Sequence, residues 1–238
     1  MGVKTTVREG LRQAMHRTGV QAPLRLLRRL RGQDTTHLTL PELSDRFDYI
    51  YEHGIWSGDV APPSGLGSSL AATEGLRAEL PALLDELGVR SLLDLGCGDY
   101  TWMQTLSLDV EYHGVDVSAR VIEQNRRDHP EVRFSVLDAT SDEIPRADAV
   151  LCREVLFHLS LADSLRVIDN LRRSGSTYLL TTSDDSSSVN ADIVSGDFRP
   201  INLCRAPFDF PAPIARIDDA AISKSRHLGV WRIDSLGS

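Results

Sequence analysis

Residues 92–103 read LLDLGCGDYTWM, and this stretch decides the fold of the 238-residue chain. It overlaps a short apolar run, residues 90–96, which is typical of a buried parallel strand and ends in glycine. Gly96 and Gly98 let the backbone turn sharply and approach a ligand closely, where a β-carbon would collide. Thr101 stands where a dinucleotide-binding turn has its third glycine. The stretch therefore predicts a strand and a ligand-binding turn that disfavours a pyrophosphate.

Strand-like and helix-like patterns alternate outward from this stretch. Leucines recur at helical spacing over residues 76–87, although Pro81 should kink that helix or open its second half. The expected elements that follow are strands at 111–118, 132–138, 148–155 and 176–183, helices at 118–130 and 161–175, and two C-terminal strands at 213–219 and 228–233. We expect an α/β fold with a Rossmann-like, mostly parallel sheet, helices on both faces and an antiparallel C-terminal edge hairpin.

Charged residues are distributed unevenly along the chain. Residues 1–33 hold eight Lys or Arg and one Glu, a net charge of +7, while the remainder holds 18 bases and 33 acids, a net charge of −15. We expect a basic helical N-terminal extension over residues 1–44 and one domain over residues 45–238. The amphipathic segment LRLLRRLRG, residues 24–32, should pack on the acidic body or on a second subunit of a homodimer. Docking to an acidic partner or a membrane interface is the alternative.

Composition narrows the classes of function. No window approaches the ~18 apolar residues that a membrane span needs, and the N-terminus lacks the apolar core of a secretory signal, so we expect a cytoplasmic protein without a membrane span. The cysteines, Cys97, Cys152 and Cys204, are odd in number and widely spaced, which favours reduced thiols over disulfides or structural zinc. So acidic a body should repel a phosphate backbone, which argues against a nucleic-acid substrate.

Acidic residues stand at the ends of three successive predicted strands: Asp94, Asp116 and Asp138. One acid at a strand end is often only a helix N-cap, but three in this order, with Gly96 and Gly98, form a specific pattern. The pattern resembles the class I S-adenosylmethionine-dependent methyltransferases. In that family the acid-x-Gly-x-Gly turn packs against the methionine part of the cofactor, the second acid binds the ribose hydroxyls and the third accepts from the adenine amino group. A carboxylate has the two acceptor oxygens that a vicinal diol demands.

The resemblance covers residues 66 to 183 and implies S-adenosylmethionine as cofactor. The Gly, Pro and Ser-rich loop at residues 57–69 is a candidate lid. We expect Trp56 and Ser68 to contact the cofactor, with Tyr49 and Tyr51 closing over it; packing of an N-terminal aromatic helix on the sheet is the alternative.

The end of the fourth strand supplies the candidate catalytic groups. His158 titrates near neutral pH and should accept the proton of the attacking group, unless it only caps a helix or shapes the pocket. Glu154 is the second candidate, and strand alternation should send Arg153 and Glu154 to opposite sides. Asp184 and its neighbour Asp185 are potential metal ligands, but the fourth strand ends without an evident acidic ligand, so no metal is expected.

A polar segment follows the fifth strand and leaves two interpretations open. It contains Asn190, Asp192, Asp197, Arg199 and Asn202, which suit either a hydroxyl-rich substrate pocket or a hydrogen-bonded loop. In a pocket, Arg199 would clamp a carboxylate or phosphate.

The segment at residues 147–183, together with the following GDFRPINL, residues 196–203, and a Pro-rich stretch, resembles a bacterial methyltransferase subgroup associated with sugars, glycans and natural products. This implies methylation of a hydroxyl on a small molecule or glycan. The alternatives are an RNA or protein methyltransferase docked by the basic extension, and a module that binds S-adenosylmethionine without turnover.

Overall fold

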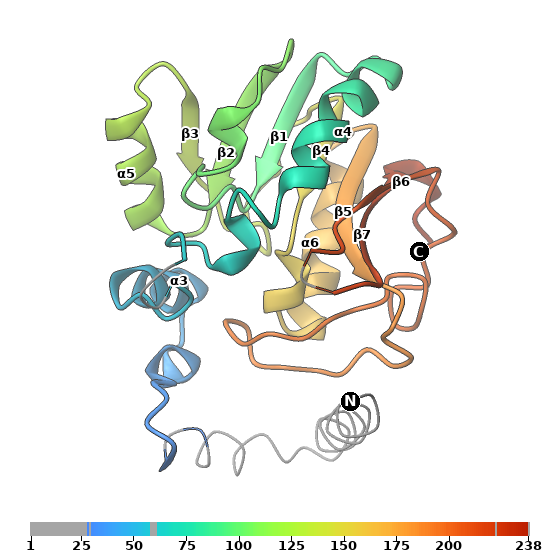
Figure 1. Cartoon of the computed structure of the whole chain (residues 1–238). Coiled ribbons are helices and arrows are strands. Elements are labelled where there is room, and N and C mark those ends of the chain that lie inside the picture. The colour runs from blue at the N-terminus through green and yellow to red at the C-terminus, as the bar shows by residue number, and fades with distance from the viewer. Residues whose placement is uncertain (1–27, 29, 58–60, 222, 238) are drawn as a thin grey trace.

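The computed structural model describes residues 28, 30–57, 61–221 and 223–237, so most of the predicted basic helix lies outside the described residues. The strands form one seven-stranded sheet in the order β3-β2-β1-β4-β5-β7-β6 (Figure 1). Strands β1 to β5 pair in parallel, and β7 pairs antiparallel with both β5 and β6. The predicted Rossmann-like sheet and its C-terminal antiparallel hairpin are confirmed.

The elements have the following bounds. The strands are β1 (Ser91–Leu95), β2 (Glu111–Asp116), β3 (Arg133–Val136), β4 (Ala149–Cys152), β5 (Tyr178–Asp184), β6 (Ala215–Asp218) and β7 (Arg226–Arg232). The α-helices are α3 (Leu43–Glu52), α4 (Glu74–Glu86), α5 (Ala119–Asp128) and α6 (Leu161–Arg173), and the short 3₁₀-helix η4 spans Leu156–His158. None of the described helices is long and apolar enough to cross a membrane.

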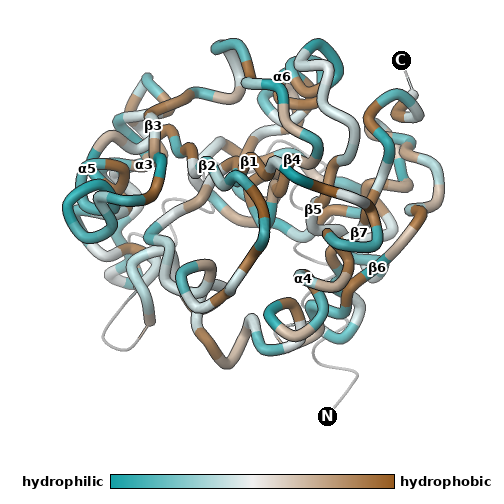
Figure 2. Tube along the Cα trace, turned by 90° about the horizontal axis from the view of Figure 1, so that it is seen from above, coloured by the Kyte–Doolittle hydropathy of each residue, from teal (hydrophilic) through white to brown (hydrophobic). Residues whose placement is uncertain are grey.

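Helices cover both faces of the sheet (Figure 2). Helix α4 packs its leucines against one side of β1, β4 and β7, and α5 covers β3 with Val121 and Ile122. Helix α6 covers the opposite side, where Ile168 and Leu171 meet Leu93 and other inward residues. Because both faces are covered, β4 is apolar and buried throughout, as a central parallel strand must be.

Local sequence signals explain most element boundaries. Ser118 caps α5 by accepting from the Val121 amide, and Ser160 caps α6 in the same way. Pro81 lies inside α4, which continues to Glu86, so the proline does not end the helix. The division between residues 1–44 and 45–238 stays a prediction, although α3 spans it.

Two segments lie at the carboxyl ends of the parallel strands. Figure 1 shows α3 below the ends of β1 and β2, and the long connection between β5 and β6 runs along the same end of the molecule. In an open parallel sheet this edge is where ligands bind, next to the point where strand order reverses. Here that point lies between β1 and β4.

The surroundings of Gly229 show how closely the core around Trp231 is packed. A β-carbon at this position in β7 would lie 2.2 Å from the Trp231 ring, whose side chain is fully buried. We expect Gly229→Ala to lower the free energy of unfolding by about 1–3 kcal/mol, because the indole must move within a filled core. Denaturant unfolding measures this. Gly237→Ala is the matched control, since its β-carbon meets nothing within 4 Å; equal stability of the two variants would contradict the packing argument.

Candidate functional site

A pocket opens where β1, β2 and β4 end. Its walls come from α3, the loop after α3, the turn after β1, and the segments that follow β2, β3 and β4. The lining includes all nine predicted site residues: Trp56, Ser68, Asp94, Gly96, Gly98, Asp116, Asp138, Glu154 and His158. The structure therefore brings these residues to one cavity, and their roles stay predictions.

The glycine turn is closed on both sides by neighbouring segments. Gly96 and Gly98 have φ angles of +78° and +57°, which favour glycine. A β-carbon on Gly96 would lie 2.3 Å from the Val155 side chain, and one on Gly98 would lie 2.4 Å from the Ser64 hydroxyl oxygen. Both glycines are thus required by conformation and by space.

Asp94 lies at the pocket end of β1 and is only 4% exposed. One carboxylate oxygen accepts from the Tyr112 hydroxyl at 2.7 Å. Burial raises the pKa of Asp94 to about 7, although the Tyr112 hydrogen bond and the charge of Arg153 act in the opposite direction. A cationic ligand would relieve the cost of this buried charge.

Asp116 ends β2 and holds the turn in place. Its two oxygens accept from the backbone amides of Gly98, at 3.1 Å, and Ser118, at 2.9 Å. Burial raises the pKa of Asp116 to about 6 in spite of these bonds. Each carboxylate oxygen has a second lone pair, so the residue retains acceptor capacity for a ligand.

Asp138 follows β3, and one of its oxygens accepts from both the backbone amide and the hydroxyl of Thr140. Trp56, another lining residue, lies beside His158, with ring centroids 4.5 Å apart, and packs edge-on against Phe47. A carboxylate after β3 and an aromatic side chain after α3 therefore both line the cavity.

His158 ends η4 and is held on two sides by the connection between β5 and β6. Its Nδ1 donates to the Asp197 carbonyl at 2.9 Å, and its own carbonyl accepts from the Gly196 amide. Phe198 lies 5.5 Å from the imidazole, between ring centroids. Burial lowers the pKa of His158, while the charges of Glu154 and Asp197 oppose that effect.

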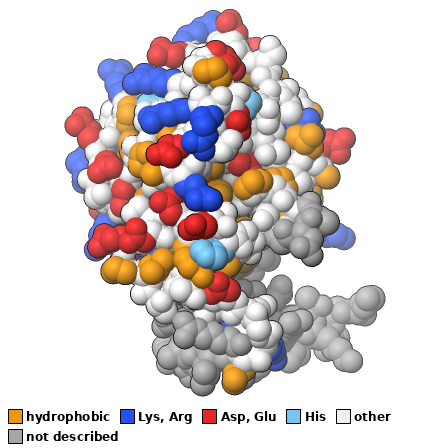
Figure 3. Space-filling model, turned by 90° about the vertical axis from the view of Figure 1, so that its left-hand side faces the viewer, with side chains coloured by type: hydrophobic (Ala, Val, Ile, Leu, Met, Phe, Trp, Pro, Cys, Tyr) orange, Lys and Arg blue, Asp and Glu red, His pale blue; other side chains and the backbone are white. Residues whose placement is uncertain are grey.

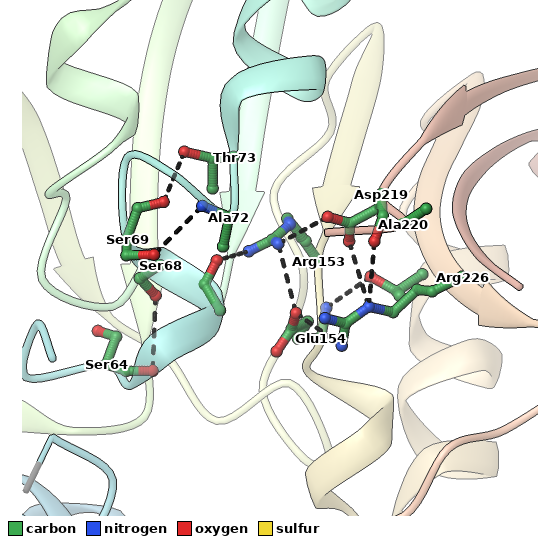
Figure 4. Close-up of polar contacts among 12 residues, drawn as sticks. Ser64, Ser68, Ser69, Ala72, Thr73, Arg153, Glu154, Asp219, Ala220 and Arg226 are labelled. Atoms are coloured by element: carbon green, nitrogen blue, oxygen red, sulfur yellow. Dashed lines mark hydrogen bonds and ion pairs between the residues drawn. The ribbon is translucent and has the colours of Figure 1, made fainter. Parts of the chain in front are cut away.

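The prediction that Arg153 and Glu154 point to opposite sides is wrong. Strand β4 ends at Cys152, so strand alternation no longer applies, and Glu154 has a left-handed φ of +62°. The Arg153 guanidinium lies 3.3 Å from the Glu154 carboxylate, and both residues line the pocket (Figure 4). Strain at such a position is common at ligand sites.

The structure also differs from the expectations for Tyr49 and Arg199. Tyr49 does not line the pocket; its hydroxyl donates to Asp34 at 2.7 Å, outside the cavity. The polar segment is a hydrogen-bonded loop: the Asn190 amide donates to three backbone carbonyls, and Arg199 donates to those of Ala191 and Leu156. Arg199 is 3% exposed and does not line the pocket, so it is not a clamp for a ligand there.

The acidic residues after β5 are engaged within the protein. Asp184 accepts from the Ser186 and Ser223 hydroxyls, and Asp185 pairs with Arg216. Within the described ranges no group of three or more His, Cys, Asp or Glu side chains is arranged to hold a metal ion.

Several residues of the site have no signal in the sequence. Ser64 exchanges hydrogen bonds with Asp99, which ties the Pro-rich loop to the glycine turn. Asp219 and Arg226 of the C-terminal hairpin contact Arg153 and Glu154. These are contacts between distant segments, and no spacing rule in the chain predicts them.

The raised pKa of Asp94 has a consequence for stability. Because the folded protein binds a proton between about pH 4 and pH 7 that the unfolded chain has released, the free energy of unfolding should fall as pH rises through this range. We expect Asp94→Asn without ligand to match the wild type near pH 4 and to exceed it by at least about 1 kcal/mol near pH 8. Urea titrations at both pH values measure the difference; a pH-independent difference would contradict the assignment.

Residues 93–174 match the family model of a methyltransferase domain. The crystal structure of PH0226 protein from Pyrococcus horikoshii OT3 is similar with a TM-score of 0.50 and 21% identity, over 67% of this chain and 88% of that one. The methyltransferase domain of bacterial CtHen1 is similar with a TM-score of 0.50 and 16% identity, over 68% and 99% of the two chains.

Magnesium protoporphyrin IX methyltransferase from Synechocystis PCC 6803, solved with bound S-adenosylhomocysteine, has a TM-score of 0.46 and 16% identity, over 61% of this chain and 72% of that one. No curated protein matches the sequence significantly. The matched domain includes Asp94, the glycine turn, Asp116, Asp138 and His158. The chain carries a class I S-adenosylmethionine-dependent methyltransferase domain.

Proposed function

We propose that the protein transfers the methyl group of S-adenosylmethionine to a hydroxyl of a small molecule or glycan, with His158 as the proton acceptor. The observation that supports this most directly is the hydrogen bond from His158 Nδ1 to the Asp197 carbonyl. A carbonyl oxygen only accepts, so Nδ1 carries the hydrogen and Nε2 of the neutral ring keeps its lone pair. His158 lines the same pocket as the proposed cofactor-binding residues.

The pKa of His158 supports a base rather than an acid. Burial lowers that pKa, so the imidazole is neutral at pH 7 and able to accept a proton. Glu154 is the less suitable base, because its carboxylate is paired with two guanidinium groups, those of Arg153 and Arg226. An ordinary hydroxyl has a high pKa and its anion is scarce, which is why a base helps this reaction.

The pocket residues fit the cofactor. The two buried carboxylates with raised pKa values suit a cationic ligand, and the glycine turn leaves space that β-carbons would fill. We propose that Asp94, Gly96 and Gly98 contact the methionine part, Asp116 the ribose and Asp138 the adenine, with Trp56 and Ser68 against the cofactor. When bound, S-adenosylmethionine supplies a methyl group activated by the sulfonium. The side chains align the acceptor and exclude water, which can lower a barrier by ~7–11 kcal/mol.

The surroundings of His158 support a small acceptor. The Trp56 and Phe198 rings lie next to the imidazole, and Trp56 lines the pocket together with Phe47 and Tyr51, so an acceptor that reaches Nε2 lies against aromatic side chains. Figure 3 shows the face of the molecule around α3 and α5, where basic and acidic side chains are interspersed. Arg120 lies near Glu52 and Arg133 near Glu111, and such pairing of bases with acids does not favour docking of a phosphate backbone.

The cofactor assignment is tested by calorimetry. We expect S-adenosylmethionine to bind one to one without added metal, and Asp116→Asn to weaken binding by about 1–3 kcal/mol, because one acceptor for the ribose diol becomes a donor. The asparagine keeps the size of the side chain. Tight binding of NAD with none of S-adenosylmethionine would disprove the assignment.

The role of His158 is tested by kinetics with an acceptor found by screening sugars and phenols for S-adenosylhomocysteine release. His158→Ala should lower kcat by about 10²–10⁴-fold with cofactor affinity preserved. In the wild type, activity should fall as the imidazole is protonated, at a pH below the ordinary His value of 6.5, and this acidic limb should vanish in the variant.

His53→Ala, at an exposed position after α3, is the control for the loss of a histidine. An unchanged kcat in His158→Ala would remove His158 from the mechanism. Cofactor binding without any turnover across the panel would favour a non-catalytic module.

A further inference from the structure

Four charged side chains form a cluster at the end of β4, next to the pocket (Figure 4). Arg153 pairs with Asp219 at 2.9 Å and with Glu154 at 3.3 Å. Arg226 pairs with Glu154 at 3.0 Å, and its Nε lies 3.8 Å from an Asp219 oxygen. Two positive and two negative groups therefore alternate in a closed arrangement, which we call the charge cluster.

The charge cluster is buried, so its formation carries a large desolvation free energy. The side chains of Arg153, Asp219 and Arg226 are 6%, 1% and 2% exposed, and that of Glu154 is 18% exposed. Removing such charges from water costs several kcal/mol per ion, and their mutual attraction often does no more than offset that cost. Arg153 Nε and Arg226 Nη2 are also buried without a hydrogen-bond partner among the described residues. Stability alone is thus a weak reason for the cluster.

Sheet order locates the cluster relative to the proposed cofactor. Asp138 follows β3 and Asp116 ends β2, while Arg153 and Glu154 follow β4, and the strands lie in the order β3-β2-β1-β4. With adenine proposed at Asp138 and ribose at Asp116, the pocket continues past β1 to the residues after β4, which leaves that part of the cavity for the rest of the cofactor. Adjacent strands are about 4.8 Å apart, so β4 lies on the order of 10 Å from β2. Arg153 and Glu154 line this part of the pocket, so the amino-acid end of a cofactor placed in this way, an ammonium and a carboxylate, comes within their reach.

The four residues divide into two pairs. Arg153 and Glu154 line the pocket, whereas Asp219 and Arg226 do not, and contact the first pair from the C-terminal hairpin. The loop before α4 completes the enclosure, because Arg153 donates to the Gly67 carbonyl at 2.9 Å. A β-carbon on Gly67 would lie 2.6 Å from a Glu154 oxygen, so this loop is packed directly on the carboxylate.

We propose that Asp219 and Arg226 are positioning residues that hold Arg153 and Glu154 as a pair of opposite charges which recognises the amino-acid end of the cofactor. A zwitterion needs a donor for its carboxylate and an acceptor for its ammonium, and the pair offers a guanidinium and a carboxylate side by side. Asp219 pairs with Arg153 and Arg226 pairs with Glu154, so each hairpin residue offsets the charge of one pocket residue and fixes its side chain at the pocket wall. The inference rests on the proposed cofactor site and extends it to a hairpin outside the matched domain.

The test compares two ligands that differ only in the amino-acid end. S-adenosylhomocysteine carries it, and 5′-methylthioadenosine has the same nucleoside and thioether without it. Calorimetry on the full chain should show that Asp219→Asn and Arg226→Lys weaken S-adenosylhomocysteine binding by at least about 10-fold while leaving 5′-methylthioadenosine binding unchanged. A purely structural role would weaken both ligands by the same factor, and that result would overturn the proposal.

Matched variants keep the outcome interpretable. Arg232→Ala removes an exposed arginine of the same strand, which pairs with Asp234, and should change neither affinity. If a hairpin variant fails to fold by circular dichroism, Glu154→Gln, which keeps the side-chain shape, should show the same selective loss. Equal affinity of the wild type for both ligands would also overturn the proposal. Failure of the wild type to bind either ligand would instead disprove the cofactor assignment.

Discussion

The carboxyl ends of adjacent parallel strands bring the side chains of Asp94 and Asp116 into one buried cavity, and most of the site follows from the need to accommodate them. Burial raises both pKa values, to about 7 and about 6. Two carboxylates in such surroundings are unfavourable as ions unless a positive group approaches. A sulfonium and an ammonium meet that condition, whereas a diphosphate does not. The electrostatics of the site thus favour a positively charged ligand such as S-adenosylmethionine, which agrees with the match to a methyltransferase domain.

Segments far apart in the chain are required to keep this cavity in shape. The glycine turn is held by Asp116, by Ser64 from the Pro-rich loop and by Val155 after β4. The connection between β5 and β6 supplies the carbonyl that orients His158. Asp219 and Arg226 arrive from the C-terminal hairpin, which joins the sheet at β5. The antiparallel hairpin therefore extends the sheet beyond β5 and also contacts two residues that line the pocket, Arg153 and Glu154.

The sequence predicts the parts that depend on local pattern. Apolar runs and N-caps such as Ser118 locate the strands and helices, and acids at successive strand ends locate Asp94, Asp116 and Asp138, because parallel strands end at one edge. The remaining features depend on tertiary contacts. Arg153 meets Asp219 across 66 residues and His158 meets Asp197 across 39, and no periodicity encodes such pairs.

The expected orientation of Arg153 and Glu154 is wrong for two reasons. Strand β4 ends at Cys152, before both residues, and Glu154 has a left-handed backbone conformation. A strand's last residue depends on its neighbours' pairing, which local composition does not determine.

The most direct test of the central claim is the number of protons released when S-adenosylmethionine binds at pH 7. Calorimetry in two buffers of different ionisation enthalpy measures it. If the ligand's positive charge lies beside Asp94, binding lowers the pKa of that carboxyl and releases about half a proton, and Asp94→Asn abolishes most of the release. Binding with no proton release, or with proton uptake, would contradict the account.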